Sequence, residues 1–110
     1  MRTITAHDEI DRLFAGGRRV SYPALLVLAM PTPEGADRGG RVLFVAGKRL
    51  GPAVHRNRCK RVLRETARRA GADLTGWDVA LIARRGTADA DPAELDHGYR
   101  DALVALGITR

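Results

Sequence analysis

The sequence predicts an α+β fold, a small two-layer sandwich in which helices pack on a sheet of three or four strands. Segments with helical spacing of apolar residues alternate with short apolar runs. Their order is helix, strand, strand, helix, strand, helix, with room for one extra strand. The 110 residues suit a single domain, residues 1–110, because neither a repeat nor a linker interrupts them. A hydrophobic content of 45% is ordinary for a folded protein, so we expect one modest core.

The first helix is expected to begin at Thr5, because Thr5 can cap it and Asp8 follows three residues later. Ile10, Leu13 and Phe14 give this helix a short apolar face. The glycines at 16–17 are expected to end it.

Two strands and a loop follow. Residues 20–30 are mostly Leu and Val and predict a strand, with Pro23 near its start, where a missing N–H donor is tolerated. Residues 31–41 are rich in Pro, Gly and Asp and predict a loop. Residues 42–46 predict the second strand.

A basic helix is predicted to run to about residue 70, after a turn over residues 47–52. At 100° per residue, the apolar side chains fall on one side of it: Cys59, Val62, Leu63, Thr66, Ala67 and Ala70. The opposite side, called the basic face below, carries Asn57, Arg61, Arg64 and Arg68, flanked by Arg58, Lys60 and Arg69.

The basic face favours a polyanionic partner. Solvated helix faces usually alternate charge signs, but here like charges repel one another and only Glu65 offsets them. Phosphate is the commonest polyanion that such a surface binds. A merely solvated face is the alternative interpretation.

The last two elements are a strand over residues 77–83 and a helix that begins at Asp91. Asp91, Pro92 and Glu94 supply a cap, a first-turn proline and an acidic first turn. The apolar face of this helix consists of Leu95, Tyr99, Ala102, Leu103 and Leu106. Gly71 and Gly107 are expected to end the second and third helices.

Composition narrows the class of partner. A net charge of +6 and a pI near 10.7 favour an anion. Arg supplies nearly all the positive charge and suits RNA, although a bias of the source genome would give the same preference. Cys59 is the only cysteine and lies on the apolar helix face, so we expect a small core residue in a reducing compartment. Without a signal-peptide-like or 18-residue apolar run, the chain is expected to be soluble and cytoplasmic.

Residues 51–65 resemble the signature of the bacterial ribonuclease P protein component, through Gly51, Ala53, Val54, Arg56, Asn57, Arg58, Lys60, Arg61, Arg64 and Glu65. Residues 8–17, 48–51 and 78–84 are also similar to corresponding segments of that family. The resemblance implies a left-handed crossover around the basic helix. It also implies a subunit of a ribonucleoprotein that removes the 5′ leader from precursor tRNA.

The resemblance also implies which residues and partners act. The protein would bind the catalytic RNA and precursor tRNA, and it would bind neither a membrane nor DNA. When free of RNA, it would be a monomer. Mg²⁺ would be held by the RNA, so the protein would supply no catalytic residue and no metal ligand. The expected RNA-binding residues are Lys48, Arg49, His55, Arg56, Asn57, Arg58, Lys60, Arg61, Arg64 and Arg68.

The resemblance places a leader cleft between the first helix and the sheet, with Ile10, Phe14 and Leu28 at its wall. The family commonly has Phe at position 10, Tyr at position 28 and Lys at position 52. Here Ile10, Leu28 and Pro52 imply a more aliphatic cleft and one phosphate contact fewer. An aromatic on a short amphipathic helix is usually a core residue, so Phe14 has two interpretations.

The sequence leaves three other functions open. The second choice is a general structured-RNA-binding protein of ribosomal type, without a nuclease partner. A helix-turn-helix DNA-binding protein fits less well, because strands flank the basic helix. A protein-only nuclease would need clustered ligands, yet His7, His55 and His97 lie on separate elements and Asp91, near Asp89, is better explained as a helix cap.

Overall fold

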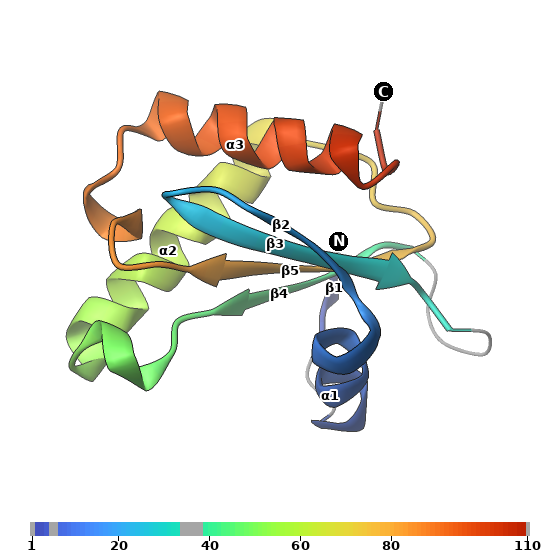
Figure 1. The fold of residues 1–110 in the computed structure, drawn as a ribbon, viewed down its shortest axis with the longest axis horizontal. Coiled ribbons are helices and arrows are strands. Elements are labelled where there is room, and N and C mark those ends of the chain that lie inside the picture. Colours follow the sequence, from blue (N-terminus) through green and yellow to red (C-terminus); the bar gives the residue numbers. More distant parts are fainter. Residues whose placement is uncertain (1, 5–6, 34–38, 110) are drawn as a thin grey trace.

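The computed structural model describes residues 2–4, 7–33 and 39–109 and confirms the predicted α+β class. Its main elements are β1 (Arg2–Thr3), α1 (His7–Gly16), β2 (Arg18–Ser21), β3 (Leu25–Pro31), β4 (Arg41–Val45), α2 (Ala53–Ala70), β5 (Trp77–Ala83) and α3 (Pro92–Ala105). Short 3-10 helices η1 (Lys48–Leu50) and η2 (Thr87–Asp89) precede α2 and α3 (Figure 1).

One mixed sheet organises the molecule, with strand order β1-β4-β5-β3-β2. The pairs β1–β4 and β4–β5 are parallel, whereas β5–β3 and β3–β2 are antiparallel. Because β4 and β5 are parallel neighbours, α2 forms the crossover connection between them. The two-residue β1 is a strand that the sequence pattern does not predict, since two residues carry no periodicity.

Helices cover both faces of the sheet, so the expected two layers have a partial third. Alternate side chains of a strand point to opposite faces. Leu25, Val27 and Ala29 of β3 pack in the larger core with α2 and α3. On the other face, Leu28 packs in a smaller core with Leu13 of α1. The helix α1 therefore covers part of the face opposite α2 and α3.

The single strand predicted over residues 20–30 is wrong in one respect, because this segment forms an antiparallel hairpin. Val20 of β2 lies opposite Val27 of β3. The backbone N–H of Tyr22 donates to the carbonyl oxygen of Leu25 at 2.9 Å and closes the turn. Pro23 therefore lies in the turn, where its missing donor is harmless. Apolar residues on both sides of Pro23 hid this turn in the sequence.

The other helix boundaries follow the predicted signals. Gly71 ends α2 in the left-handed conformation, with φ of 56°, and its N–H donates to the carbonyl of Ala67 at 3.2 Å. Asp91 caps α3, since its Oδ1 accepts from the backbone N–H of Ala93 at 3.0 Å. Thr5, the predicted cap of α1, lies outside the described residues.

A buried polar network fastens α1 to the sheet. Arg41 of β4 donates from Nε and Nη2 to the two carboxylate oxygens of Asp78 of β5, at 2.9 and 2.6 Å. Arg41 also forms an ion pair with Glu9 of α1. Thr32 Oγ1 donates to Asp78 at 2.9 Å. The hydrogen bond from Arg41 to Asp78 raises the pKa of the guanidinium, which burial opposes. The network therefore sets the position of α1 on the sheet.

Candidate RNA-binding surfaces

The chain turns sharply before α2, and glycine permits the turn. Gly51 has φ of 125°, a backbone conformation that side chains disfavour. Its N–H donates to the carbonyl of Lys48 at 3.2 Å, which closes η1 against the start of α2. The exposed side chains of Lys48 and Arg49 therefore lie just before the basic helix, as the sequence predicts.

The two unlike faces predicted for α2 are present. Cys59 and Leu63 are fully buried, as are Thr66 and most of Ala67. Val62 and Ala70 are half-buried at the edges of this apolar face. On the opposite side the residues of the basic face are exposed: Asn57, Arg61, Arg64 and Arg68. Burial of one side thus holds the other toward solvent along the full helix.

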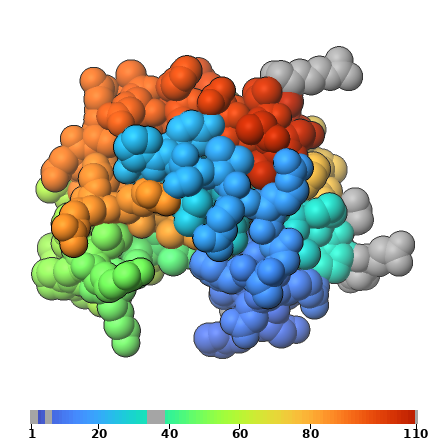
Figure 2. All heavy atoms as spheres, viewed as in Figure 1, coloured from blue at the N-terminus to red at the C-terminus, as the bar shows by residue number. Residues whose placement is uncertain are grey.

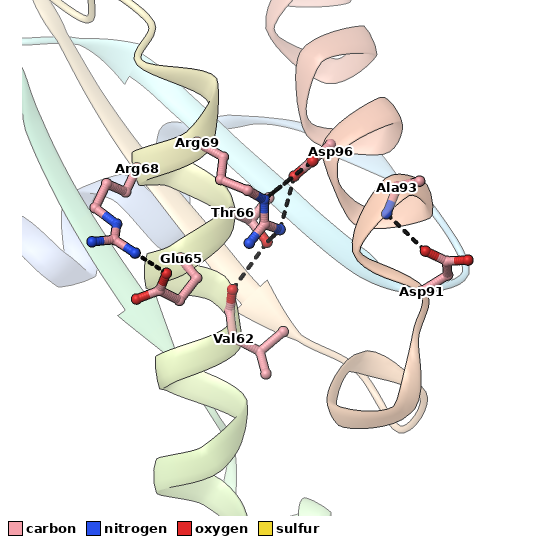
Figure 3. Close-up of polar contacts among 8 residues, drawn as sticks. All are labelled: Val62, Glu65, Thr66, Arg68, Arg69, Asp91, Ala93 and Asp96. Carbon is pink, nitrogen blue, oxygen red and sulfur yellow. Dashed lines mark hydrogen bonds and ion pairs between the residues drawn. The ribbon is translucent and has the colours of Figure 1, made fainter.

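Intramolecular ion pairs engage some of the cations and leave others available. Arg68 pairs with Glu65, and Arg69 Nη2 lies 2.9 Å from Asp96 Oδ1 (Figure 3). Arg58 lies 3.9 Å from Asp89, and both side chains are exposed. Within residues 2–4, 7–33 and 39–109, no carboxylate lies within ion-pair distance of the remaining cations of α2: Arg56, Lys60, Arg61 and Arg64.

Three polar side chains of α2 have particular surroundings. The guanidinium of Arg64 lies over the ring of Phe44 of β4, 5.4 Å from the ring centroid. This contact orients Arg64 while leaving it exposed. Arg56 is half-buried, and its Nε is buried without a hydrogen-bond partner in the described part of the chain. His55 Nε2 lies 3.7 Å from the buried Cys59 Sγ, so His55 also supports the helix start.

The three residues expected at the leader cleft have different exposures. Phe14 is 39% exposed, Ile10 is half-buried, and Leu28 is fully buried beneath α1. Leu28 packs with Leu13 of α1 in the smaller core, and its place on the cleft wall stays a prediction. The core interpretation of Phe14 is weakened by its exposure.

The sheet face beside α1 is hollowed. Figure 2 shows the depression between α1 in blue and the segment around η1 in green. A hollow of about 530 Å³ lies at the ends of β3, β4 and β5, where Leu26, Val45 and Ile82 remain half-buried. Its edges carry three arginines: Arg49, Arg84 and Arg85. Arg84 and Arg85 were missed in the sequence; their signal is a basic pair directly after the strand 77–83.

The described residues contain neither a metal-binding cluster nor a membrane-spanning helix. No group of three or more His, Cys, Asp or Glu side chains lies close enough to hold a metal ion in the ranges 2–4, 7–33 and 39–109. No helix in the same part of the chain is long and apolar enough to cross a membrane.

Comparison with known proteins identifies the family. The family model described as ribonuclease P matches residues 1–107. The ribonuclease P protein component of Dehalococcoides mccartyi is 37% identical over 100 residues, which span 91% of this chain and 80% of the relative. That of Stutzerimonas stutzeri is 36% identical over 101 residues, spanning 78% of this chain and 77% of the relative.

Two solved structures show the same fold. The RNase P protein of Staphylococcus aureus matches with a TM-score of 0.79 and 22% identity, covering 100% of this chain and 99% of the other. The RNase P protein from Thermotoga maritima matches with a TM-score of 0.73 and 23% identity, with the same coverage. Together with the matches in sequence, they show that the chain belongs to the bacterial ribonuclease P protein family, components of an endoribonuclease that works with an RNA partner.

Proposed function

We propose that this protein binds the catalytic RNA of ribonuclease P through the basic face of α2 and guides the 5′ leader of precursor tRNA to the scissile bond. The single observation that carries the proposal is the row of α2 cations that lack a carboxylate partner among the described residues: Arg61 and Arg64 are exposed, and Arg56 and Lys60 are half-buried. Removal of the leader gives the mature 5′ end of the tRNA. The proposed setting is the cytoplasm, with a monomeric free protein.

Phosphates are the ligands that fit the basic face best. Lys60, Arg61 and Arg64 project from one rigid helix, so their spacing is fixed before RNA arrives. Arginine forks bind phosphate oxygens in pairs, and each contact releases a counterion. Asn57 is exposed beside them and carries both a donor and an acceptor, which suits a 2′-hydroxyl. Lys48, Arg49, His55 and Arg56 extend the surface to the N-terminal end of α2.

The hollow beside α1 has the chemistry that a single strand requires. Its apolar floor of Leu26, Val45 and Ile82 can contact unpaired bases, while the arginines at its edges can contact the backbone. Ile10 of α1 packs against the same sheet face, and Phe14 is exposed on the same helix. A duplex would be too wide to bring its paired bases to such a floor. We therefore place the leader on this face of the sheet and the catalytic RNA on α2.

The chemistry is assigned to the RNA. Metal-assisted hydrolysis of the phosphodiester needs Mg²⁺, which the catalytic RNA would hold. The residues of this chain would bind, orient and neutralise phosphates, so that the two RNA molecules approach each other against less repulsion. Less Mg²⁺ would then be needed for the same rate.

Reconstitution tests the proposal directly. Purified protein is added to the ribonuclease P RNA of the same organism and a precursor tRNA with a 5′ leader. The midpoint of the Mg²⁺ dependence of cleavage is measured with and without protein, and mature tRNA serves as the control for leader binding. The proposal expects a lower Mg²⁺ midpoint and preference for the precursor. Tight RNA binding with an unchanged Mg²⁺ midpoint would instead indicate a general RNA-binding protein.

A further inference from the structure

Besides the hollow, the surface has a groove beside α2, on the side of the helix away from β4. It has a volume of about 430 Å³ and runs between α2 and the segment from η2 to the first turn of α3. Its floor is apolar and is formed by Val62, Ala88, Ala90 and Leu95. Three of these side chains are half-buried and Leu95 is buried, so the floor is a continuation of the main core to the surface.

The groove opens beside the basic face. Arg61 lies on its rim and also belongs to the basic face, and Arg58 lies one turn earlier on the same rim. An RNA backbone bound along Arg61 and Arg64 would therefore pass the mouth of the groove. A nucleotide with an unpaired base could turn that base toward the apolar floor while its phosphate stays on the basic face.

The charges around the groove largely compensate one another, unlike those of the basic face. Arg69 is held by Asp96 and Glu65 is paired with Arg68 (Figure 3). The carboxylate of Asp89 lies 3.9 Å from Arg58. Two of the three arginines on the rim thus have a carboxylate partner. The groove has little excess positive charge to attract a phosphate. A flat group with an uncharged apolar face would pay only a small desolvation free energy on entering it.

The rim also provides a fixed planar partner. The Nε of Arg69 donates to Asp96 Oδ1 at 3.0 Å and to Oδ2 at 3.1 Å, and its Nη2 lies 3.4 Å from Thr66 Oγ1. These bonds hold the guanidinium plane, so it can stack on a ring at a small entropic cost. The carboxylate oxygens of Glu65, which lines the groove, can accept from N–H groups at the edge of a ring.

We propose that this groove receives one unpaired nucleobase of the catalytic RNA. The inference rests on the proposed binding of that RNA to the basic face. An apolar floor, a fixed guanidinium and carboxylate acceptors match the faces and the edge of a base, while the neighbouring cations match its phosphate. Unpaired bases that stack on arginine planes are a common way for proteins to recognise a particular place in a folded RNA. The groove therefore sets the register of the RNA on α2.

The nucleotide is identified first. In the variant Pro92→Cys, a thiol-reactive photocrosslinker is attached to the new cysteine at the exposed edge of the groove. Cys59 does not compete for the reagent because it is fully buried. Crosslinking to the catalytic RNA is expected at one unpaired nucleotide. That nucleotide is then made abasic, which removes the base and keeps the phosphate. With wild-type protein the abasic RNA should bind roughly ten-fold more weakly, the scale of one base stacked on a protein group, with an unchanged salt dependence.

A filled groove provides the second arm. Ala88→Leu and Ala90→Leu each add bulk to the floor without changing charge, and Ala105→Leu on exposed α3 is the matched control. Melting curves establish which variants are folded. A folded filling variant should bind normal RNA as weakly as abasic RNA, while Ala105→Leu should behave as wild type. If neither filling variant folds, the abasic RNA with wild-type protein decides.

Two results would overturn the inference. One is full-strength binding of the abasic RNA to wild-type protein. The other is a folded Ala88→Leu variant that still distinguishes normal from abasic RNA. Failure of the proposed function looks different, because then the protein would not lower the Mg²⁺ midpoint of cleavage whatever the state of the groove.

Discussion

At the scale of the residue, exposure separates side chains that can bind from those that support the fold. Phe14 and Leu28 were expected on the same cleft wall, but Phe14 is 39% exposed and Leu28 is fully buried. The Arg41–Asp78 pair is buried, while Arg64 is exposed and oriented over Phe44. The same residue type therefore has two roles in this chain, and burial decides which.

Replacement of Phe14 by Ala should weaken leader binding more than folding. Loss of one stacked base costs about 1–3 kcal/mol, so precursor tRNA should bind roughly ten-fold more weakly, with mature tRNA unaffected. Because Phe14 is partly exposed, its loss should cost less than the about 3–5 kcal/mol typical of core Phe→Ala changes.

Binding titrations of both tRNAs, beside melting curves, check this prediction for Phe14. Ile10→Phe should tighten leader binding slightly, since it enlarges the wall. A strongly destabilised Phe14→Ala variant that still prefers the precursor would assign Phe14 to the core.

Replacement of Asp78 by Asn should destabilise the protein strongly. Arg41 would keep its charge in a buried site with one carboxylate partner fewer, and such losses cost about 3–5 kcal/mol. Asp96→Asn is the control, because its pair with Arg69 is partly exposed and should contribute less than about 1 kcal/mol. Urea unfolding of both variants measures the difference; equal losses would contradict the role given to the buried pair.

At the scale of the element, α2 has a buried apolar side and an exposed basic face, and different features lie on the two sides of the basic face. On the side toward β4, Phe44 lies beneath Arg64. On the side toward α3 lies the groove, whose rim charges are largely paired with one another. Between them lies the basic face, where excess charge is concentrated. In the proposed complex a single helix would therefore separate phosphate contacts from contacts with bases.

The combined change Arg61→Ala and Arg64→Ala should weaken binding of the catalytic RNA and flatten its salt dependence. Each lost phosphate contact should change the logarithmic slope by about 0.7 to 0.9. The control is Arg18→Ala with Arg100→Ala, which removes the same charge from exposed sites on β2 and α3. Binding isotherms at several salt concentrations give the slopes. If both double variants shift the slope equally, net charge rather than the basic face governs binding.

At the scale of the whole molecule, the sheet holds two surfaces apart on opposite sides. The helices α2 and α3 share one face, and α1 with the hollow occupies the other (Figure 1). In the proposed arrangement the catalytic RNA and the leader would occupy largely different surfaces, which adjoin at Arg49. Substrate and catalyst would meet at the edge of the protein rather than within it.

The protein alone is expected not to cut precursor tRNA at any Mg²⁺ concentration, because the proposal gives the metal ions to the RNA. The assay is cleavage by RNA-free protein, purified again through a denaturing step, with the reconstituted complex as the positive control. Cleavage that persists and copurifies with the protein would reveal an active site in this chain.

Stability should fall in strongly alkaline solution because of Tyr99. Burial raises the pKa of Tyr99 to about 12 from 10.0, so its contribution is fully present below pH 10 and is lost as the pH rises toward 12. Between pH 10 and 12 the free energy of unfolding should fall by about 3 kcal/mol. Urea unfolding should show a shallower decline for Tyr99→Phe, which has no hydroxyl to ionise. An equal decline in both proteins would contradict this assignment.

The sequence by itself determined the class of fold, most element boundaries and the basic face. These features depend on local signals, namely the period of apolar residues along α2, the cap at Asp91 and the glycine at Gly71. The resemblance over residues 51–65 gave the family, which the comparisons confirm.

Only the tertiary structure decided which side chains are free to act. The burial of Leu28 under α1 and the pairing of Arg69 with Asp96 depend on contacts between segments distant in the chain. The turn at Pro23 depends on strand pairing that the apolar residues on both sides of it do not reveal. No periodic pattern records such contacts, because each residue has the same local neighbours whether or not another element covers it. The hollow and the groove therefore became visible only when the sheet had brought their walls together.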